Sequence, residues 1–289
     1  MAPRRFAEHT EGVPPTFVVV PQWQGSVSER AMRLCDGAEA IRGDLPASAT
    51  RTVDVPVEAG DSENTSVNRF SSLLQVREGH AAALRAADDW VLTIGGDCGV
   101  SLTAVEHASK QHPGTLAVVW LDAHPDLHTP ESSPSGAFSG MVLRAISGEG
   151  AERLALSPAV AVPLERVVLA GARDIDPAED ALIRDRAIPV LDVESADFAV
   201  KLTDAVRHAG ASAVYLHIDL DVLDPSALSG LANPVPFGIT IEGLTAAITA
   251  LRAQFPLAGA TIAGFAPVSP EAASDDLSPI LRIIGALTR

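Results

Sequence analysis

Short apolar runs alternate along this chain with longer segments in which apolar residues recur at helical spacing. The short runs predict strands over residues 16–20, 91–94, 115–121, 166–171, 188–192, 213–219 and 260–265. The segments between them predict helices near 27–42, 68–87, 100–111, 177–186, 197–209, 241–254 and 275–288. Such alternation is typical of a mainly parallel sheet with helices on both faces. The predicted fold class is therefore α/β.

Segments outside the periodic runs refine this arrangement. Thr240 is expected to cap the helix over 241–254, because its hydroxyl can accept a hydrogen bond from the first helical turn. The Pro- and Ser-rich stretch 129–140 is predicted to be an active-site loop, and the polar stretch 43–66 an irregular surface excursion. No strong boundary interrupts the chain, so residues 1–289 are predicted to form one domain.

Composition narrows the classes of partner. A formal net charge of −16 argues against nucleic acid and anionic membranes, which require basic patches. No apolar run approaches membrane-spanning length, and the start MAPRRFAEHTEG lacks the apolar region of a secretory signal. Two cysteines, Cys35 and Cys98, do not make a disulfide framework. We therefore expect a cytoplasmic protein whose partner is neither nucleic acid nor a membrane.

Acidic segments follow two of the predicted strands. Asp122, His124 and Asp126 alternate after the run 115–121, and Asp219 and Asp221 alternate at the end of 213–219. Alternate residues of an extended backbone point the same way, and the carboxyl ends of parallel strands share one edge of a sheet. Converging carboxylates repel one another unless cations neutralise them. The sequence therefore predicts a site for two metal ions, with manganese, iron, cobalt or zinc favoured over calcium.

Two other aspartates near these motifs have simpler interpretations. Asp224 precedes Pro225 in a predicted turn and is interpreted as a cap rather than a ligand. Asp97 precedes a predicted helix and is interpreted in the same way.

Four segments together resemble the ureohydrolase family of arginase, agmatinase and formimidoylglutamase. Gly95 to Cys98 resembles the family's Gly-Gly-Asp-His-Ser, and Asp122 to Asp126 resembles Asp-Ala-His-x-Asp. Asp219 to Pro225 resembles Asp-x-Asp-x-x-Asp-Pro, and Gly171 to Glu179 resembles an arginase segment. The resemblance implies a three-layer α/β/α fold with about eight strands, and a homo-oligomer, either a trimer or a hexamer.

The resemblance also implies a ligand set and a mechanism. It implies two Mn²⁺ ions bridged by Asp122 and Asp219, the first held also by Asp126 and position 98, and the second by His124 and Asp221. The ions would supply a nucleophile from water for attack on a guanidinium or formimidoyl carbon. Asp126 would orient this nucleophile and pass a proton to the leaving amine.

This sequence departs from the family pattern at three positions. Cys98 stands where the pattern has a histidine ligand, which favours softer metals such as zinc or iron. Ser139 stands at the position of a substrate-side histidine, and Pro267 at that of a guanidinium-binding glutamate. An alternative hypothesis follows: a catalytically impaired relative that serves as a subunit or a ligand-binding regulator.

Other polar residues suggest the substrate. Asp176 and Glu179 match an arginase segment that contacts the substrate's α-amino group, and His128 and Ser139 are candidate substrate-binding residues. A modified arginine such as Nω-hydroxy-arginine is the preferred substrate, because its lower basicity needs less anionic anchoring. His217 is interpreted as a hydrogen-bonding neighbour of the ligands, with a direct role in substrate binding or proton donation as the alternative.

Overall fold

A computed structural model describes residues 15–87 and 90–289 of the chain. The N-terminal segment on which the prediction of no secretory signal rests lies outside the described residues. Within them, no helix has the length and apolar character needed to cross a membrane.

Eight strands form one sheet, in the order β2-β1-β3-β8-β7-β4-β5-β6, and every pair of neighbours in the described part of the chain is parallel. The strands are β1 (Thr16–Val20), β2 (Thr50–Thr52), β3 (Val91–Gly95), β4 (Leu116–Leu121), β5 (Val167–Ala170), β6 (Val190–Leu191), β7 (Ala213–Asp219) and β8 (Leu257–Ala263). This sheet confirms the predicted α/β class with about eight strands.

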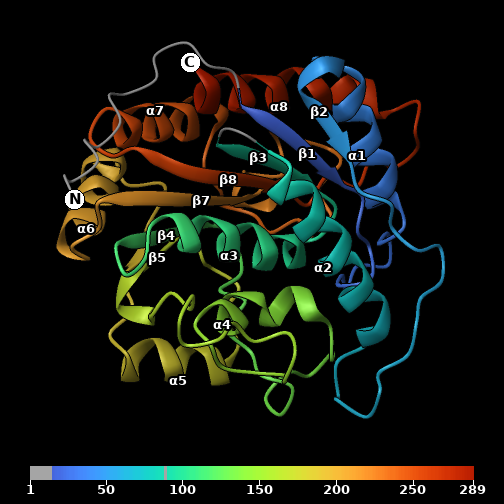
Figure 1. Cartoon of the computed structure of the whole chain (residues 1–289). Coiled ribbons are helices and arrows are strands. Elements are labelled where there is room, and N and C mark those ends of the chain that lie inside the picture. The colour runs from blue at the N-terminus through green and yellow to red at the C-terminus, as the bar shows by residue number, and fades with distance from the viewer. Residues whose placement is uncertain (1–14, 88–89) are drawn as a thin grey trace, which may run out of the picture.

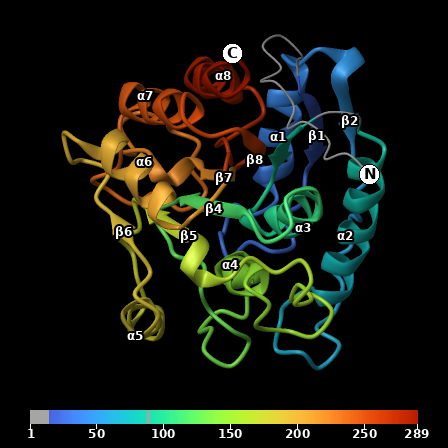
Figure 2. The same ribbon diagram turned by 60° about the vertical axis from the view of Figure 1, so that its left-hand side comes forward.

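Helices cover both faces of the sheet (Figures 1 and 2). The α-helices are α1 (Arg33–Gly43), α2 (Phe70–Arg85), α3 (Ser101–Gln111), α4 (Val142–Ile146), α5 (Pro177–Asp185), α6 (Phe198–His208), α7 (Ile241–Arg252) and α8 (Ala273–Thr288). The first, sixth, seventh and eighth pack into one apolar core, and the second to fifth contribute to cores on the other face. The arrangement is the predicted three-layer α/β/α fold.

Strand β4 illustrates how the sheet separates the two cores. Ala117, Val119 and Leu121 belong to the core beneath α6, α7 and α8, whereas Val118 and Trp120 belong to the core beneath α3 and α4. All of these side chains are fully buried. A strand covered on both faces is apolar throughout, so its sequence is a continuous run rather than an alternation.

The structure differs from the sequence-based predictions mainly at edges and ends. Strand β2 lies inside the stretch 43–66 predicted to be irregular; it is a short edge strand of Thr-Arg-Thr without an apolar run. Strand β8 begins at Leu257 rather than residue 260. The prediction started too late because Gly259 is a weak strand former; in the structure this glycine packs against the ring of Tyr215. Helix α1 begins at Arg33, not residue 27, after a series of turns.

The four central strands position the functional motifs. Strands β3, β8, β7 and β4 are neighbours, so the segments after β3, β4 and β7 meet at one edge of the sheet. Strand β8 lies between two of them and is followed by Gly264, which has a positive φ of 85°. A Cβ atom at this position would lie 2.1 Å from Asp219 Oδ1. Glycine is therefore required there for the Asp219 carboxylate to reach the site.

Candidate active site

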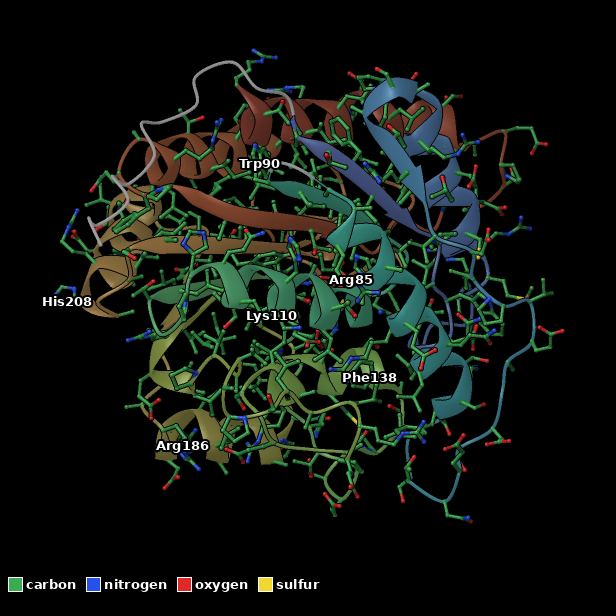
Figure 3. All side chains as sticks on the ribbon, viewed as in Figure 1. Arg85, Trp90, Lys110, Phe138, Arg186 and His208 are labelled. Carbon is green, nitrogen blue, oxygen red and sulfur yellow. The ribbon has the colours of Figure 1, made fainter. Side chains whose placement is uncertain are left out.

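A cavity of about 390 Å³ opens at the carboxyl edge of the central strands. It is lined by Ser26, Val27, Leu34, Asp97, Cys98, His124, Asp126, His128, Pro134, Ser135, Ala137, Ser139, Gly140, Asp174, Asp176, Glu179, Asp219, Asp221, Ala232, Asn233 and Gly264. The loop 129–140 contributes several of these residues, as predicted. Its Phe138 packs into the core beside α4 (Figure 3).

Two groups of donor atoms form what we call the floor of the cavity. The first comprises Cys98, Asp122, His217 and Asp219, whose ligand atoms all lie within 4.8 Å of one another. Cys98 and Asp219 line the cavity, whereas Asp122 and His217 are not among its lining residues. Cys98 belongs to the short 3₁₀ turn that precedes α3. Its Sγ lies 2.9 Å from Asp219 Oδ2 and 3.8 Å from Asp122 Oδ2. The structure thus brings together residues from three separate segments.

The second group comprises Asp122, His124 and Asp221 and shares Asp122 with the first. His124 Nδ1 lies 3.3 Å from Asp122 Oδ1 and 3.2 Å from Asp221 Oδ2. Backbone amides orient the carboxylates: the Ala123 amide donates to Asp221 and the Asp221 amide to Asp219. The first group contains a sulfur donor, whereas the second offers oxygen and nitrogen alone.

Crowding of the carboxylates perturbs their protonation. Burial, followed by the charges of Asp221 and Asp122, raises the pKa of Asp219 well above its usual value. Burial and the charge of Asp122 raise the pKa of Asp221 to about 6. Burial opposes protonation of His124, but its hydrogen bonds with Asp122 and Asp221 prevail and raise its pKa to about 12. The raised pKa values of Asp219, Asp221 and His124 favour their protonated forms in the absence of cations, and metal ions could take the place of these protons.

Asp126 lines the cavity but lies outside both groups of donors. Its backbone has a positive φ of 53°, an unusual conformation for a residue other than glycine. Its carboxylate is buried, and Oδ2 has no hydrogen-bond partner among the described residues. Burial and the charge of Asp122 raise its pKa well above the usual range. Both its ligand role and its catalytic role stay predictions.

A third polar group lies elsewhere in the cavity and comprises His128, Asp176 and Glu179. His128 Nε2 lies 2.9 Å from Asp176 Oδ2 and 3.6 Å from Glu179 Oε2. Glu179 accepts hydrogen bonds from the backbone amides of Leu127 and Asp176, so it joins the start of α5 to the acidic loop after β4. Asp176 is half exposed, while Glu179 is buried.

The positions that depart from the family pattern have different environments. Cys98 and Ser139 line the cavity, and the Ser139 amide donates to the carbonyl of Gly25. Pro267 is buried and is not among the residues that line the cavity.

The two predicted caps are confirmed. Asp97 accepts from the Gly99 amide, and Asp224 from the amides of Ser226 and Phe237.

Sequence reasoning missed several residues around the site. Asp174 lies 3.7 Å from His124 Nε2, and Ser101 lies 2.8 Å from His217 Nδ1. Arg173 donates to the backbone carbonyls of Asp221 and Val235, so it ties together loops beside the second donor group. Asp174 and Arg173 belong to the segment from Gly171 to Glu179 that resembles an arginase segment, so the sequence did contain a signal for them. Ser101 gave no signal, since its role depends on how α3 meets β7.

Metal ions fit the residues present in the floor. Two buried polar atoms, Asp126 Oδ2 and His217 Nε2, lack partners among the described residues beside a cluster of buried carboxylates. Unpaired buried polar atoms are rare, and cations would satisfy both these atoms and the carboxylate charge. Carboxylate, imidazole and thiol donors suit transition metals better than calcium.

Comparison with known proteins agrees with this geometry. The arginase family profile matches residues 30–277. An arginase of Staphylococcus aureus (strain MRSA252) is 31% identical over 208 residues, which cover 69% of this chain and 67% of that protein. An N(omega)-hydroxy-L-arginine amidinohydrolase of Streptomyces lavendulae is 29% identical over 269 residues, which cover 90% of this chain and 93% of that one.

The fold also has a close counterpart among solved structures. An arginase of Entamoeba histolytica in complex with L-ornithine superimposes with a TM-score of 0.80 and 23% identity, covering 94% of this chain and 97% of that one. The donor groups, the profile match and the shared fold lead to one conclusion: this chain belongs to the arginase family, whose members are metal-dependent hydrolases of C–N bonds.

Proposed function

We propose that this chain hydrolyses the guanidino C–N bond of a modified arginine, with Nω-hydroxy-arginine as the preferred substrate, in one arginase-like domain. The observation that carries the proposal is the convergence of Asp122, Asp219 and Asp221 with two imidazoles in the floor of the cavity. Two divalent ions would occupy this floor: manganese at the second donor group, with zinc or iron favoured by Cys98 at the first.

When bound, such ions supply a water-derived nucleophile at neutral pH and stabilise negative charge on the reacting centre. The chain's own residues supply orientation and proton transfer. Asp126 lines the cavity, and its Oδ2 has no hydrogen-bond partner among the described residues. The raised pKa of Asp126 suits a group that accepts a proton and then donates it to the departing amine. Water adds to the guanidino carbon, the bond to the amine nitrogen breaks, and that nitrogen receives the proton.

An N-hydroxyguanidine suits this cavity better than an ordinary guanidine. At position 267 a buried proline, which does not line the cavity, provides no carboxylate to pair with a guanidinium. The less basic hydroxyguanidine depends less on such a charge. The long alignment with a relative named N(omega)-hydroxy-L-arginine amidinohydrolase supports the same substrate.

The third polar group is proposed to bind the α-amino end of the substrate. Asp176 is the more accessible carboxylate, because both oxygens of Glu179 accept hydrogen bonds from backbone amides. His128 fixes the Asp176 carboxylate through its Nε2 and contacts Ser132 through its Nδ1. Ser139 is proposed to contact the substrate nearer the reacting end.

The assay compares Nω-hydroxy-arginine, arginine and agmatine with metal-loaded protein and measures hydroxyurea, urea and amine release. We expect the highest kcat/KM for Nω-hydroxy-arginine and its loss in Asp126→Asn, with the metal content of that variant measured alongside to separate a catalytic role from the predicted ligand role. Asp185→Asn, an exposed residue at the end of α5, is the matched control. Turnover of none of the three by fully loaded protein would favour the non-catalytic alternative, in which Ser139 and Pro267 mark lost catalysis.

Assembly and location complete the proposal. We propose a homo-oligomer, a trimer or hexamer, as the family resemblance implies, and a cytoplasmic location. Both cysteines are free thiols, which suits a reducing compartment. Light scattering on purified protein measures the assembly directly, and a monomer at micromolar concentration would contradict it.

A further inference from the structure

His217 belongs to the first donor group at the floor of the cavity, although it is not among the residues that line the cavity. It is on β7, two residues before Asp219, so both side chains point to the same face of the sheet. Its side chain has no exposed surface. Its ring stacks on that of Trp120, its partner on β4, with centroids 3.5 Å apart and planes inclined by 15°.

One ring nitrogen of His217 is engaged and the other is free. Nδ1 lies 2.8 Å from the hydroxyl of Ser101, the first residue of α3. Nε2 has no hydrogen-bond partner among the residues that the structure describes, and the closest carboxylate oxygen, Asp122 Oδ2, is 3.5 Å away. A buried nitrogen without a partner is costly, and this nitrogen lies among three side chains that can ligate a metal, so the geometry points to an ion that satisfies it.

We propose that His217 Nε2 binds the first metal ion directly, together with Cys98, Asp122 and Asp219, in a site that prefers zinc, cobalt(II) or iron(II) to manganese. The four ligand atoms already lie within 4.8 Å of one another. The inference deepens the proposed function, because it rests on the same metal site. It also gives this ion an imidazole ligand from β7, although position 98 holds cysteine.

The contact between Ser101 and His217 is compatible with the tautomer that metal binding needs. If Nδ1 carries the hydrogen and donates it to Ser101 Oγ, the Nε2 lone pair faces the carboxylates and the thiol. Such a hydrogen bond to the remote nitrogen is the usual way in which a metal-binding imidazole is oriented. Ser101 is therefore a positioning residue, and the face of Trp120 prevents the ring from tilting.

The donor set explains the preference for softer ions. The first group combines sulfur, nitrogen and two carboxylates, whereas the second has one nitrogen and two carboxylates. Thiolate and imidazole select zinc, cobalt and iron, while carboxylate-rich sites suit manganese. The two positions should therefore fill with different metals when both are offered.

His217→Asn tests the ligand directly in the full chain. Asparagine keeps an atom near Nδ1 for Ser101 but removes the atom at Nε2. We expect zinc affinity at the first position to fall by about 10- to 100-fold or more, and the sulfur-to-cobalt absorption band of the Co²⁺-loaded protein to change. Ser101→Ala should produce a smaller shift in the same direction.

The matched control is His80→Asn. His80 on α2 is also fully buried, and neither of its ring nitrogens has a partner among the described residues, but it is absent from both donor groups of the floor. Its replacement should leave zinc affinity and the cobalt spectrum unchanged. If His217→Asn behaved like this control, His217 would be a packing residue and the proposal would be overturned.

X-ray absorption of the unmodified protein with one equivalent of zinc keeps the test independent of folding in the variants. We expect sulfur at about 2.3 Å and imidazole nitrogen at about 2.0–2.1 Å around the same ion. Sulfur without imidazole, or imidazole without sulfur, would overturn the proposal. Neither readout involves turnover, so an inactive protein with this zinc environment would refute the proposed hydrolysis and not the role of His217.

Discussion

Two polar regions of the same cavity differ in how their charges are satisfied. In the floor, carboxylates of Asp122, Asp219 and Asp221 crowd around few protein donors, and two buried polar atoms stay unpaired among the described residues. In the other region, His128 and backbone amides already satisfy Asp176 and Glu179. The floor is incomplete without cations, whereas the other region is complete within the protein.

This difference separates two functions within one cavity. A region that needs cations is a site for resident metal ions, because carboxylates of raised pKa give up protons when a cation arrives. A region that is already hydrogen-bonded needs no ion, and we propose that its fixed carboxylate binds the substrate. Substitutions in each region should therefore disrupt metal binding and substrate binding independently.

The largest effect is expected from the shared ligands. Asp122→Asn and Asp219→Ala should each abolish binding of both ions, because Asp122 belongs to both groups and Asp219 is predicted to bridge them. Metal analysis after reconstitution provides the measurement. Asp224→Asn is the control, since that partly exposed carboxylate belongs to a turn after the same strand. Full metal content in either floor variant would refute the bridging assignment.

Disrupting the other region should weaken substrate binding alone. Asp176→Asn is expected to raise KM for α-amino acid substrates by about 10- to 100-fold, the range for a hydrogen bond to a charged group. Metal content should not change. Steady-state kinetics with arginine-like compounds and with agmatine distinguishes the two ends of the substrate. Agmatine lacks the α-carboxylate but keeps the amino group, so 5-guanidinopentanoate, which keeps the carboxylate and lacks the amino group, is the further comparison; an equal rise in KM for this compound would argue against this role.

A smaller effect is expected when the floor gains an imidazole at position 98. Cys98→His should raise manganese affinity at the first position by about tenfold, because it removes the soft sulfur donor. It should also remove sensitivity to thiol reagents, since the only other cysteine is Cys35. Manganese titrations of the variant and the unmodified protein provide the comparison. Unchanged affinity would show that Cys98 is not a ligand.

The smallest effect is a pH dependence of the stability that metal confers. Burial and Asp122 raise the pKa of Asp221 from 3.8 to about 6, and hydrogen bonds with Asp122 and Asp221 overcome burial to raise that of His124 from 6.5 to about 12. In both cases the folded metal-free protein holds a proton that the unfolded chain releases, so its stability falls as pH rises through these windows.

The increase in Tm on metal binding should therefore be larger at about pH 8 than at about pH 5. Burial lowers the pKa of His80 to about 3. This shift makes the metal-free and the metal-loaded protein alike more stable as pH rises, so it cancels in the difference between their Tm values. Thermal melts of metal-free and metal-loaded protein at both pH values supply the four Tm values needed. A difference that shrinks toward high pH would contradict the assignment of protons to the floor.

The sequence was sufficient to predict the central strands and the acidic motifs that follow them. Strands β3, β4 and β7 are continuous apolar runs because helices cover both faces of the sheet. The edge strand β2 escaped prediction because an edge strand does not need an apolar face. Local patterns therefore indicate burial reliably, while they say little about strands that only supply backbone hydrogen bonds.

The site was predictable at the level of residues and less so at the level of contacts. Cys98, Asp122, His124, Asp219 and Asp221 could be identified from family-like motifs, and the structure brings them together. The free Nε2 of His217 could not be foreseen, because it depends on the stacking with Trp120 and the hydrogen bond to Ser101. Such contacts between distant segments emerge only when β4, β7 and α3 are packed together.

The central claim is that the floor of the cavity binds two metal ions. Purified protein, freed of metal and then reconstituted with manganese and zinc, is analysed for bound metal after removal of the excess. We predict about two ions per chain, as a pair of donor groups sharing one carboxylate requires, and their loss in Asp122→Asn. A metal content below two ions per chain under saturating conditions would contradict the account.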